Sequence, residues 1–178
     1  MTTNLRRLSA TCLIVLALSA PALADITVAF EPQNAVITSL GGTTDVQLWA
    51  NFDDSIVGWG LDLDLDMPTV ADWAIAALGP AWNETSTLDG DGLAGLAFPP
   101  GQTGDVLLAT LTFTGMEIGT TDLTLGYDGE DEGFLLELGG LDELVNYGSG
   151  SITVTPEPAT IVLLALSALA LRRRGLAL

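Results

Sequence analysis

Acidic side chains are the only groups in this chain numerous enough to suggest chemistry. The 178 residues include 23 Asp and Glu, no His and a single Cys, Cys12, near the N-terminus. Without His, the chain cannot use Ser-His-Asp or Cys-His catalysis or His-ligated zinc. Two carboxylates can hydrolyse a glycoside, but among 23 acids a suitable pair arises by chance. We therefore expect a protein that is not an enzyme and that has no catalytic residues.

Two acidic loops invite comparison with calcium sites. The segment 128–133, DGEDEG, has carboxylates at positions 1, 3 and 5 of the EF-hand template and a glycine at position 6. Position 12 would be Gly139 rather than Glu, and no helical pattern flanks the loop, so the match fails. The segment 89–92, DGDG, fails earlier, at Leu93. We predict no cofactor and no assigned metal ligand, and we leave open a calcium-binding turn of another kind.

The charges are separated along the chain. All 23 acidic residues lie between Asp25 and Glu157, and there is no Lys. The five basic residues are Arg6, Arg7, Arg172, Arg173 and Arg174. The middle of the chain has no basic patch, which excludes nucleic-acid binding. Its acidity fits either adaptation to salt or divalent cations, or a plain solvated surface.

The acidic middle of the chain consists of short extended runs, which are predicted strands, separated by glycine-rich breaks. The predicted strands are Ile26–Phe30, Ala35–Leu40, Asp45–Asn51, Ile56–Met67, Leu93–Phe98, Val106–Thr114, Asp122–Tyr127, Phe134–Leu138 and Ser151–Thr155. In the clearest of them, residues 61–66 read LDLDLD, which puts leucines on one face and aspartates on the other. Only Val70–Leu78 has an apolar spacing that fits a short helix.

The strand pattern predicts an all-β fold, a two-sheet sandwich or jelly roll of about nine strands. The segments Gly58–Asp64 and Leu107–Phe113 resemble strands of the cohesin-type β-sandwich, a nine-stranded jelly roll. The resemblance covers roughly Asp25 to Thr155. It does not imply dockerin binding, because no recognition residue can be matched.

The N-terminus has the pattern of a secretory signal peptide. Two arginines precede an apolar run, Leu8–Ala20, and the small residues of Ala22-Leu23-Ala24 follow. We predict a signal helix within residues 1–24 and cleavage between Ala24 and Asp25. A retained membrane anchor is the alternative, although the run is short for a bilayer of about 30 Å.

The C-terminus, residues 156–178, has three parts. The motif Pro156, Glu157 and Pro158 precedes an apolar run, which ends at the cluster Arg172, Arg173 and Arg174. This order resembles the PEP-CTERM sorting signal. The resemblance implies recognition by a membrane-embedded exosortase in a Gram-negative-type bacterium that makes exopolysaccharide. It also implies a transient inner-membrane intermediate, followed by release to the cell envelope or extracellular matrix.

The tail has a physical logic of its own. The two prolines hold the motif extended, and the arginines keep the C-terminus in the cytoplasm. The apolar run Ala159–Leu171 would span only about 20 Å as a helix, so its transmembrane placement requires snorkelling arginines or a locally thinner bilayer. An ordinary anchor that is never cut is the alternative.

Three functions remain for the predicted domain, residues 25–155. The first is a structural or adhesive module that contacts exopolysaccharide or another surface protein. The second is a carbohydrate-binding module with Trp49, Trp59 or Trp82 as stacking platforms. The third, the two-carboxylate glycosidase, has no support from the composition.

Overall fold

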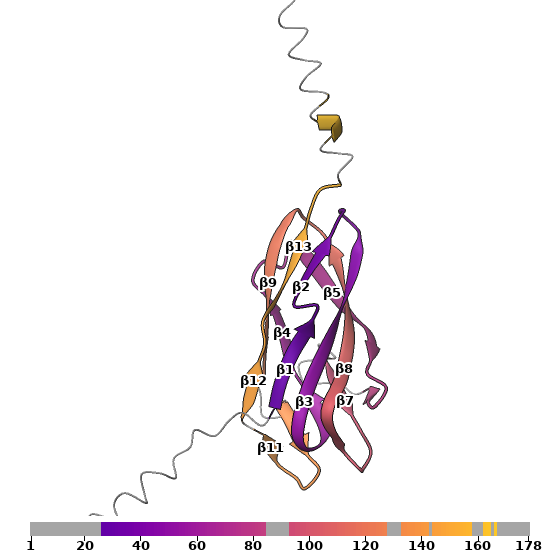
Figure 1. The fold of residues 1–178 in the computed structure, drawn as a ribbon, viewed down its shortest axis with the longest axis vertical. Coiled ribbons are helices and arrows are strands. Elements are labelled where there is room, and N and C mark those ends of the chain that lie inside the picture. Colours follow the sequence, from indigo (N-terminus) through magenta and orange to yellow (C-terminus); the bar gives the residue numbers. More distant parts are fainter. Residues whose placement is uncertain are drawn as a thin grey trace, which may run out of the picture.

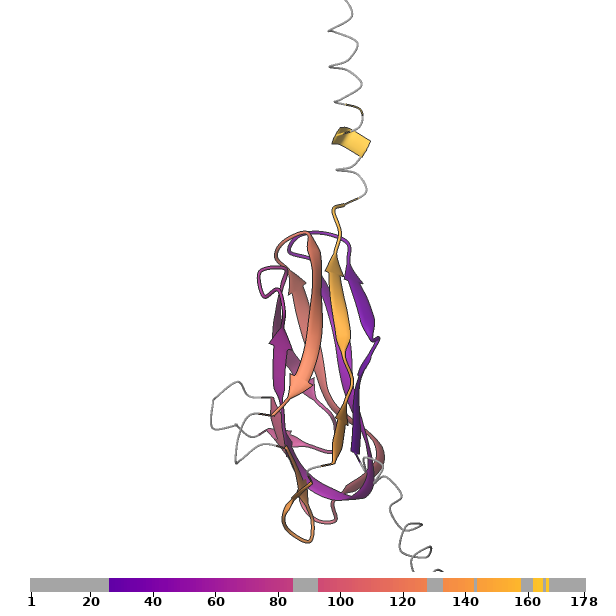
Figure 2. The same cartoon turned by 90° about the vertical axis from the view of Figure 1, so that its left-hand side faces the viewer.

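The fold is a β-sandwich, seen in a computed structural model that describes residues 26–84, 93–127, 133–142, 144–157, 162–164 and 166. Two sheets pack face to face in an elongated body, and the tail leaves from one end of it (Figure 1). The view turned by 90° shows the two layers and the space between them that the core fills (Figure 2). The prediction of an all-β, two-sheet sandwich is confirmed.

The larger sheet has nine strands. They are β1 (Ile26–Glu31), β3 (Thr43–Gly60), β5 (Ala71–Leu78), β6 (Asn83–Glu84), β7 (Ala94–Leu96), β8 (Gln102–Gly115), β10 (Gly133–Leu136), β11 (Leu141–Asp142) and β12 (Val145–Tyr147). The long strand β3 is its spine, because β3 pairs with β1 and β8 along its first half and with β7 and β10 along its second.

The smaller sheet has four strands in the order β2-β13-β9-β4. They are β2 (Asn34–Ile37), β13 (Gly150–Val154), β9 (Gly119–Gly126) and β4 (Asp62–Leu65). Near the N-terminus the chain passes from the larger sheet to the smaller one between β1 and β2, and near the C-terminus it does so between β12 and β13. The pair β1 and β12 is parallel in the larger sheet, and the pair β2 and β13 is parallel in the smaller one.

The core lies between the sheets and is almost entirely apolar. Its largest fully buried side chains are Phe52, Phe113, Phe134, Ile26, Ile37, Leu48, Ile56, Leu61, Leu93, Leu108, Leu111 and Leu123. Thr121 is the one polar side chain that is buried among the described residues. Its hydroxyl donates to Asp66 Oδ1 at 3.0 Å, which satisfies the buried group.

The alternating segment behaves as predicted. Leu61 and Leu63 are buried and Leu65 is partly buried, whereas Asp64 and Asp66 are exposed. Along this segment the leucines thus face the core and the aspartates face solvent, as a period of two requires.

The short helix predicted over Val70–Leu78 is wrong. The segment is β5, an edge strand that pairs antiparallel with β8. Trp73 and Ile75 are partly buried and pack against the core, while the residues between them are exposed. The apolar residues of this segment fit either period, and the pairing with β8 selects the strand.

The strand count also differs from about nine. The predicted strand Asp45–Asn51 and the first part of Ile56–Met67 are joined in β3, which continues through Asp53 and Asp54 with a register irregularity between Phe52 and Ile56. The predicted strand Ile56–Met67 is itself divided, because β3 ends at Gly60 and β4 belongs to the smaller sheet. The short strands β6, β11 and β12 were not predicted. Two or three residues carry no periodic signal, so such strands are defined only by their partners.

The end of the sandwich where β13 finishes is closed by a backbone hydrogen bond. Gly41 N, in the turn after β2, donates to the carbonyl oxygen of Gly115, the last residue of β8, at 2.8 Å. Beyond β13, Val162–Leu164 and Leu166 are helical. Among the described residues, no helix has the length and apolar character that crossing a membrane requires. The predicted signal helix lies outside the described residues.

Candidate interaction surfaces

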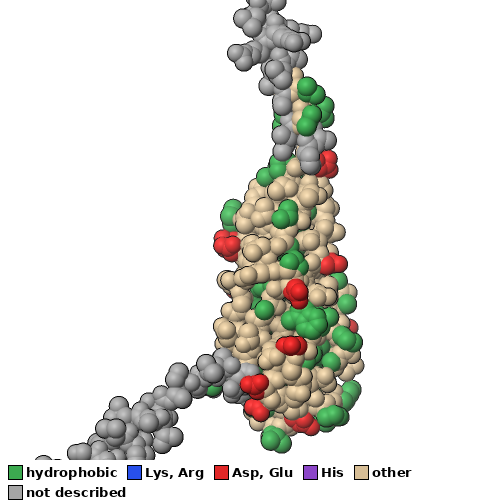
Figure 3. Space-filling model, in the orientation of Figure 1, with side chains coloured by type: hydrophobic (Ala, Val, Ile, Leu, Met, Phe, Trp, Pro, Cys, Tyr) green, Lys and Arg blue, Asp and Glu red, His purple; other side chains and the backbone are tan. Residues whose placement is uncertain are grey.

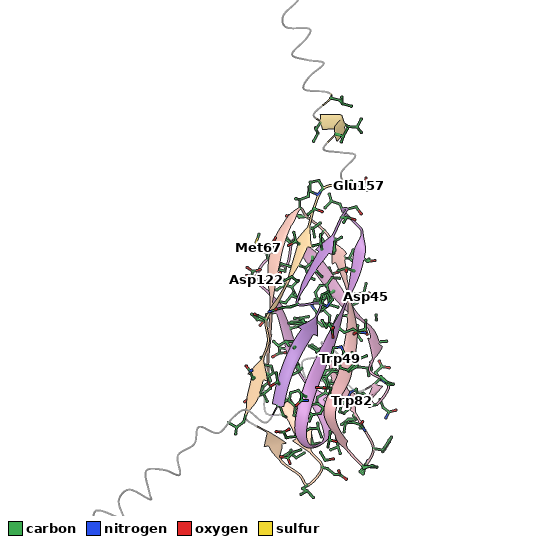
Figure 4. All side chains as sticks on the ribbon, in the orientation of Figure 1. Asp45, Trp49, Met67, Trp82, Asp122 and Glu157 are labelled. Atoms are coloured by element: carbon green, nitrogen blue, oxygen red, sulfur yellow. The ribbon has the colours of Figure 1, made fainter. Side chains whose placement is uncertain are left out.

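The described part of the predicted sorting motif begins just after the last strand ends. Thr155 N donates to Ile37 O at 2.8 Å, and Pro156 and Glu157 follow directly. Glu157 is exposed at the tip of the sandwich (Figure 4). Pro156 and Glu157 share a surface hollow of about 290 Å³ with Leu40 and Ile118. The other predicted sorting, topology and cleavage residues, Pro158, Arg172, Arg173, Arg174, Ala24 and Asp25, lie outside the described residues.

Two of the three predicted tryptophan platforms are core residues. Trp59 and Trp82 are only 3% and 6% exposed, and their rings meet edge to face with centroids 6.3 Å apart. Trp82 Nε1 also donates to Leu107 O at 3.0 Å. The expectation that Trp59 or Trp82 stacks on a sugar is therefore wrong. Trp49 alone of the three reaches the outer face of the larger sheet.

An apolar surface covers the outer side of β7, β3 and β10. Gly58 of β3 pairs with Leu96 on one side and with Leu135 on the other. A Cβ at Gly58 would lie 2.8 Å from Leu96 Cδ2 and 3.5 Å from Leu135 Cβ, so the two leucines close over this glycine. Leu96 is 45% exposed and Leu135 is 37% exposed. Solvent-exposed leucines thus form a contiguous pair on the sheet.

The loops that follow extend this surface. Ala97 packs against the core, so the next residue, Phe98, points outward and is 82% exposed. Leu138, in the turn after β10, is fully exposed. We call Leu96, Phe98, Leu135 and Leu138 together the apolar surface. Hydrophobic and acidic side chains are interspersed at the corresponding lower end of the space-filling view (Figure 3).

A single carboxylate holds these loops together. Glu137 Oε2 accepts hydrogen bonds from Ser55 Oγ at 2.5 Å and from Gly101 N at 3.1 Å. These two hydrogen bonds, first that from Ser55, hold the pKa of Glu137 below its ordinary value of 4.5. Glu137 N also donates to Ser55 O at 2.8 Å. The turns next to Phe98 and Leu138 are therefore fixed to β3, beside a hollow of about 470 Å³ that Asp54 and Leu136 also line.

Acidic residues line the edge strand β4 of the smaller sheet. Asp64 and Asp66 are exposed there, and Asp62 is partly exposed. Asp66 Oδ1 accepts from Asp122 N at 2.7 Å, so this carboxylate fixes the end of β4 against β9.

The acidic side chains of the described residues are dispersed. No three acidic, Cys or His side chains among them gather closely enough to hold a metal ion. The acidic loops 89–92 and 128–132, where calcium was left open, lie outside the described residues. Sequence reasoning missed the apolar surface. The available signal was the run 93–98, whose apolar residues occupy both faces of a strand.

Comparison with known proteins extends the description of the fold. No family model matches the chain, and no curated protein matches it. A non-cellulosomal cohesin from the archaeon Archaeoglobus fulgidus is 17% identical, with a TM-score of 0.55 over 77% of this chain and 96% of its own. The chain has the cohesin fold.

Two further solved structures agree with this cohesin fold. The cohesin module of a Clostridium perfringens family 33 glycoside hydrolase has a TM-score of 0.56 at 11% identity, over 76% of this chain and 98% of its own. The third ScaC cohesin of Acetivibrio cellulolyticus, solved in complex with the ScaB dockerin, has a TM-score of 0.51 at 16% identity, over 73% of this chain and 99% of its own. At such identities the likeness establishes the fold, and the predicted cohesin-like sandwich is confirmed.

Proposed function

We propose that this chain is an exported, non-enzymatic module that binds a partner protein at the bacterial surface through its apolar surface. One observation carries the proposal. Leu96 and Leu135 are exposed on strands that neighbour β3, and Phe98 is exposed in the loop after β7, so that burial against a partner would remove apolar area from water. The cohesin fold of the chain supports this function by analogy, since the ScaC cohesin was solved bound to a dockerin.

The partner's chemistry follows from the charge around the surface. The acids Asp54 and Glu137 line the hollow beside Leu138, and the sequence from Asp25 to Glu157 contains no Lys or Arg. A second copy of the domain would bring acid against acid. We propose a partner with an apolar pocket and a basic rim, whose association rate falls as salt rises.

The sorting tail supplies the location in this proposal. The tail leaves from the end of the sandwich that carries Pro156 and Glu157, at the far end of the body from the turn after β10 (Figure 1). A chain held by this tail would present the apolar surface away from the membrane. We propose that an exosortase recognises the Pro-Glu-Pro motif and that the protein then passes to the envelope or the exopolysaccharide matrix.

Site-specific photo-crosslinking in the native host tests the binding. A crosslinking amino acid in place of Phe98 should give one discrete adduct. The same amino acid in place of Val36, an exposed apolar residue on β2, should give none. Leu96→Ser combined with Leu135→Ser should abolish the Phe98 adduct while the protein still melts cooperatively. Equal adducts at both positions, or none at Phe98, would refute the proposed surface.

Fractionation and mass spectrometry test the sorting. Replacement of Pro156, Glu157 and Pro158 by Ala removes no core packing and should leave a folded, exported domain in the inner membrane with its tail intact. The wild type should yield a mature form that starts at Asp25 and lacks the residues from Ile161 onward. Mature wild-type protein that keeps the whole tail would replace the exosortase with a simple anchor.

A further inference from the structure

A second surface, on the outer face of the larger sheet, is separate from the apolar surface. Trp49 of β3 lies there between Ala29 of β1 and Leu107 of β8, its register partners on the two sides. Figure 4 places Trp49 near the middle of this face. In the same orientation, Figure 3 shows a compact hydrophobic area at this place with acidic side chains nearby. The indole is therefore an aromatic platform of limited apolar area, with polar and acidic groups around it.

The ring is held in position before any ligand arrives. Trp49 Nε1 donates to Gln47 Oε1 at 3.0 Å, so the indole N–H is satisfied within the same strand. The small side chain of Ala29 leaves one flank of the ring open. A platform that is already ordered loses little conformational entropy on binding. The accessible part of its partly buried ring offers an apolar, flat contact area.

Hydrogen-bonding groups lie on both sides of the ring along the strand. Asn51 Nδ2 donates to Asp105 Oδ1 at 2.7 Å on one side, and Thr112 Oγ1 donates to Asp45 Oδ1 at 2.6 Å on the other. At about 3.3 Å per residue, Asn51 lies roughly 7 Å from Trp49 and Asp45 roughly 13 Å from it. Each carboxylate retains lone pairs, and the Asn51 amide retains a second N–H and its oxygen.

We propose that this face, which we call the Trp49 face (Trp49, Gln47, Asn51 and Asp105, with Asp45 and Thr112), binds a neutral glycan chain. The apolar side of one sugar ring stacks on the indole, while hydroxyls of the same and neighbouring sugars bond to Asp105 and Asn51. The strand-long spacing of the polar groups suits an extended polymer. The single ring and its polar surroundings offer too little apolar area for a protein interface of about 800 Å² per partner.

Charge selects the class of glycan. The ionisable side chains on the described part of this face, Glu31, Asp45 and Asp105 among them, are all acidic. A polymer of uronic acids or sulfated sugars would meet like charges within a Debye length of about 8 Å. A neutral chain meets no such repulsion, and its binding should change little with salt.

Calorimetry on the full chain tests the proposal, in a zwitterionic detergent without sugar headgroups. The probes are β-1,3- and β-1,4-linked glucose hexamers, a mannose hexamer, an N-acetylglucosamine hexamer and polygalacturonate. At least one neutral hexamer should bind. Trp49→Ala should weaken that binding at least about tenfold, and Trp49→Phe, which keeps a ring, by only about threefold. Asp105→Asn should weaken it roughly fivefold through a lost charged acceptor.

The control is Phe98→Ala, which removes an exposed aromatic from the apolar surface and should leave glycan binding unchanged. It also separates the two proposals, because it should abolish partner binding alone. Failure of every neutral hexamer to bind, or binding that Trp49→Ala leaves intact, would overturn the inference. Binding confined to polygalacturonate in the presence of calcium would overturn it as well.

Discussion

At the scale of single residues, Glu137 acts as a clamp between three loops. Its folded-state pKa is lowered, so the ionised carboxylate stabilises the fold above pH 4.5, and this contribution is lost as the pH falls through the lowered pKa. Ser55 donates the hydrogen bond that lowers this pKa most. The order of the apolar surface at neutral pH thus depends on one exposed carboxylate.

We predict that Ser55→Ala lowers the melting temperature at pH 7 and that the difference from the wild type disappears near pH 3. The variant keeps every charge, so general repulsion cancels in the comparison. Thermal melts at intervals between pH 3 and pH 8 measure the effect. A deficit of the same size at all pH values would show that Ser55 matters for packing and not through the carboxylate.

Gly95 lies in close contact with the buried side chains of Trp59 and Trp82. A Cβ there would lie 2.7 Å from Trp59 Nε1 and 3.0 Å from Trp82 Cβ, and neither buried indole has space to withdraw. We predict that Gly95→Ala lowers the free energy of unfolding by about 1–3 kcal/mol in urea denaturation. Gly126→Ala, where the new Cβ meets nothing within 4 Å, is the control and should change it far less.

At the scale of elements, β4 is defined by its period of two. Leu61 is fully buried and Asp64 is exposed three residues later. We predict that Leu61→Ala costs about 2–5 kcal/mol of stability, because it leaves a cavity between the sheets. Asp64→Ala should stay within about 0.5 kcal/mol. Equal costs at the two positions, measured by urea denaturation, would contradict the assigned faces.

The strands β3 and β5 show what local sequence leaves undecided. The acids Asp53 and Asp54 suggest a break, yet β3 runs through them because β1 and β8 pair with it up to Phe52, and β8 and β10 pair with it again from Ile56. The segment Val70–Leu78 fits a helix by spacing, yet becomes a strand beside β8. Hydrogen bonds to distant strands decide both cases, and no window along the chain contains those partners.

At the scale of the whole molecule, repulsion among like charges opposes the compact state. The segment 25–157 carries all 23 acids and no basic residue, so its self-repulsion has no internal counter-charge. We predict that the melting temperature rises with sodium chloride, because screening shortens the reach of this repulsion. Melts from low to high salt measure it, and a flat response would show that the acids are too dispersed to matter.

A comparison of calcium with magnesium distinguishes general charge screening from a specific calcium-binding site. At fixed ionic strength, millimolar calcium should add no more stability than millimolar magnesium if the acidic surface only gathers counter-ions. A gain with calcium alone would assign a site to the acidic turns. The acidic residues 128 and 130–132 would then be the first to change to amides.

The sequence by itself determined the all-β class, the two faces of residues 61–66 and the acidity of the segment 25–157, because each depends on local period or on composition. It also predicts the signal peptide and the sorting tail, whose patterns are contiguous. Only the tertiary structure decided which tryptophans are buried and where Leu96 meets Leu135. Those outcomes depend on strands β3, β7 and β10 pairing across distances of tens of residues. Whether a side chain is buried depends on which residues pack against it, and these neighbours are distant in the sequence.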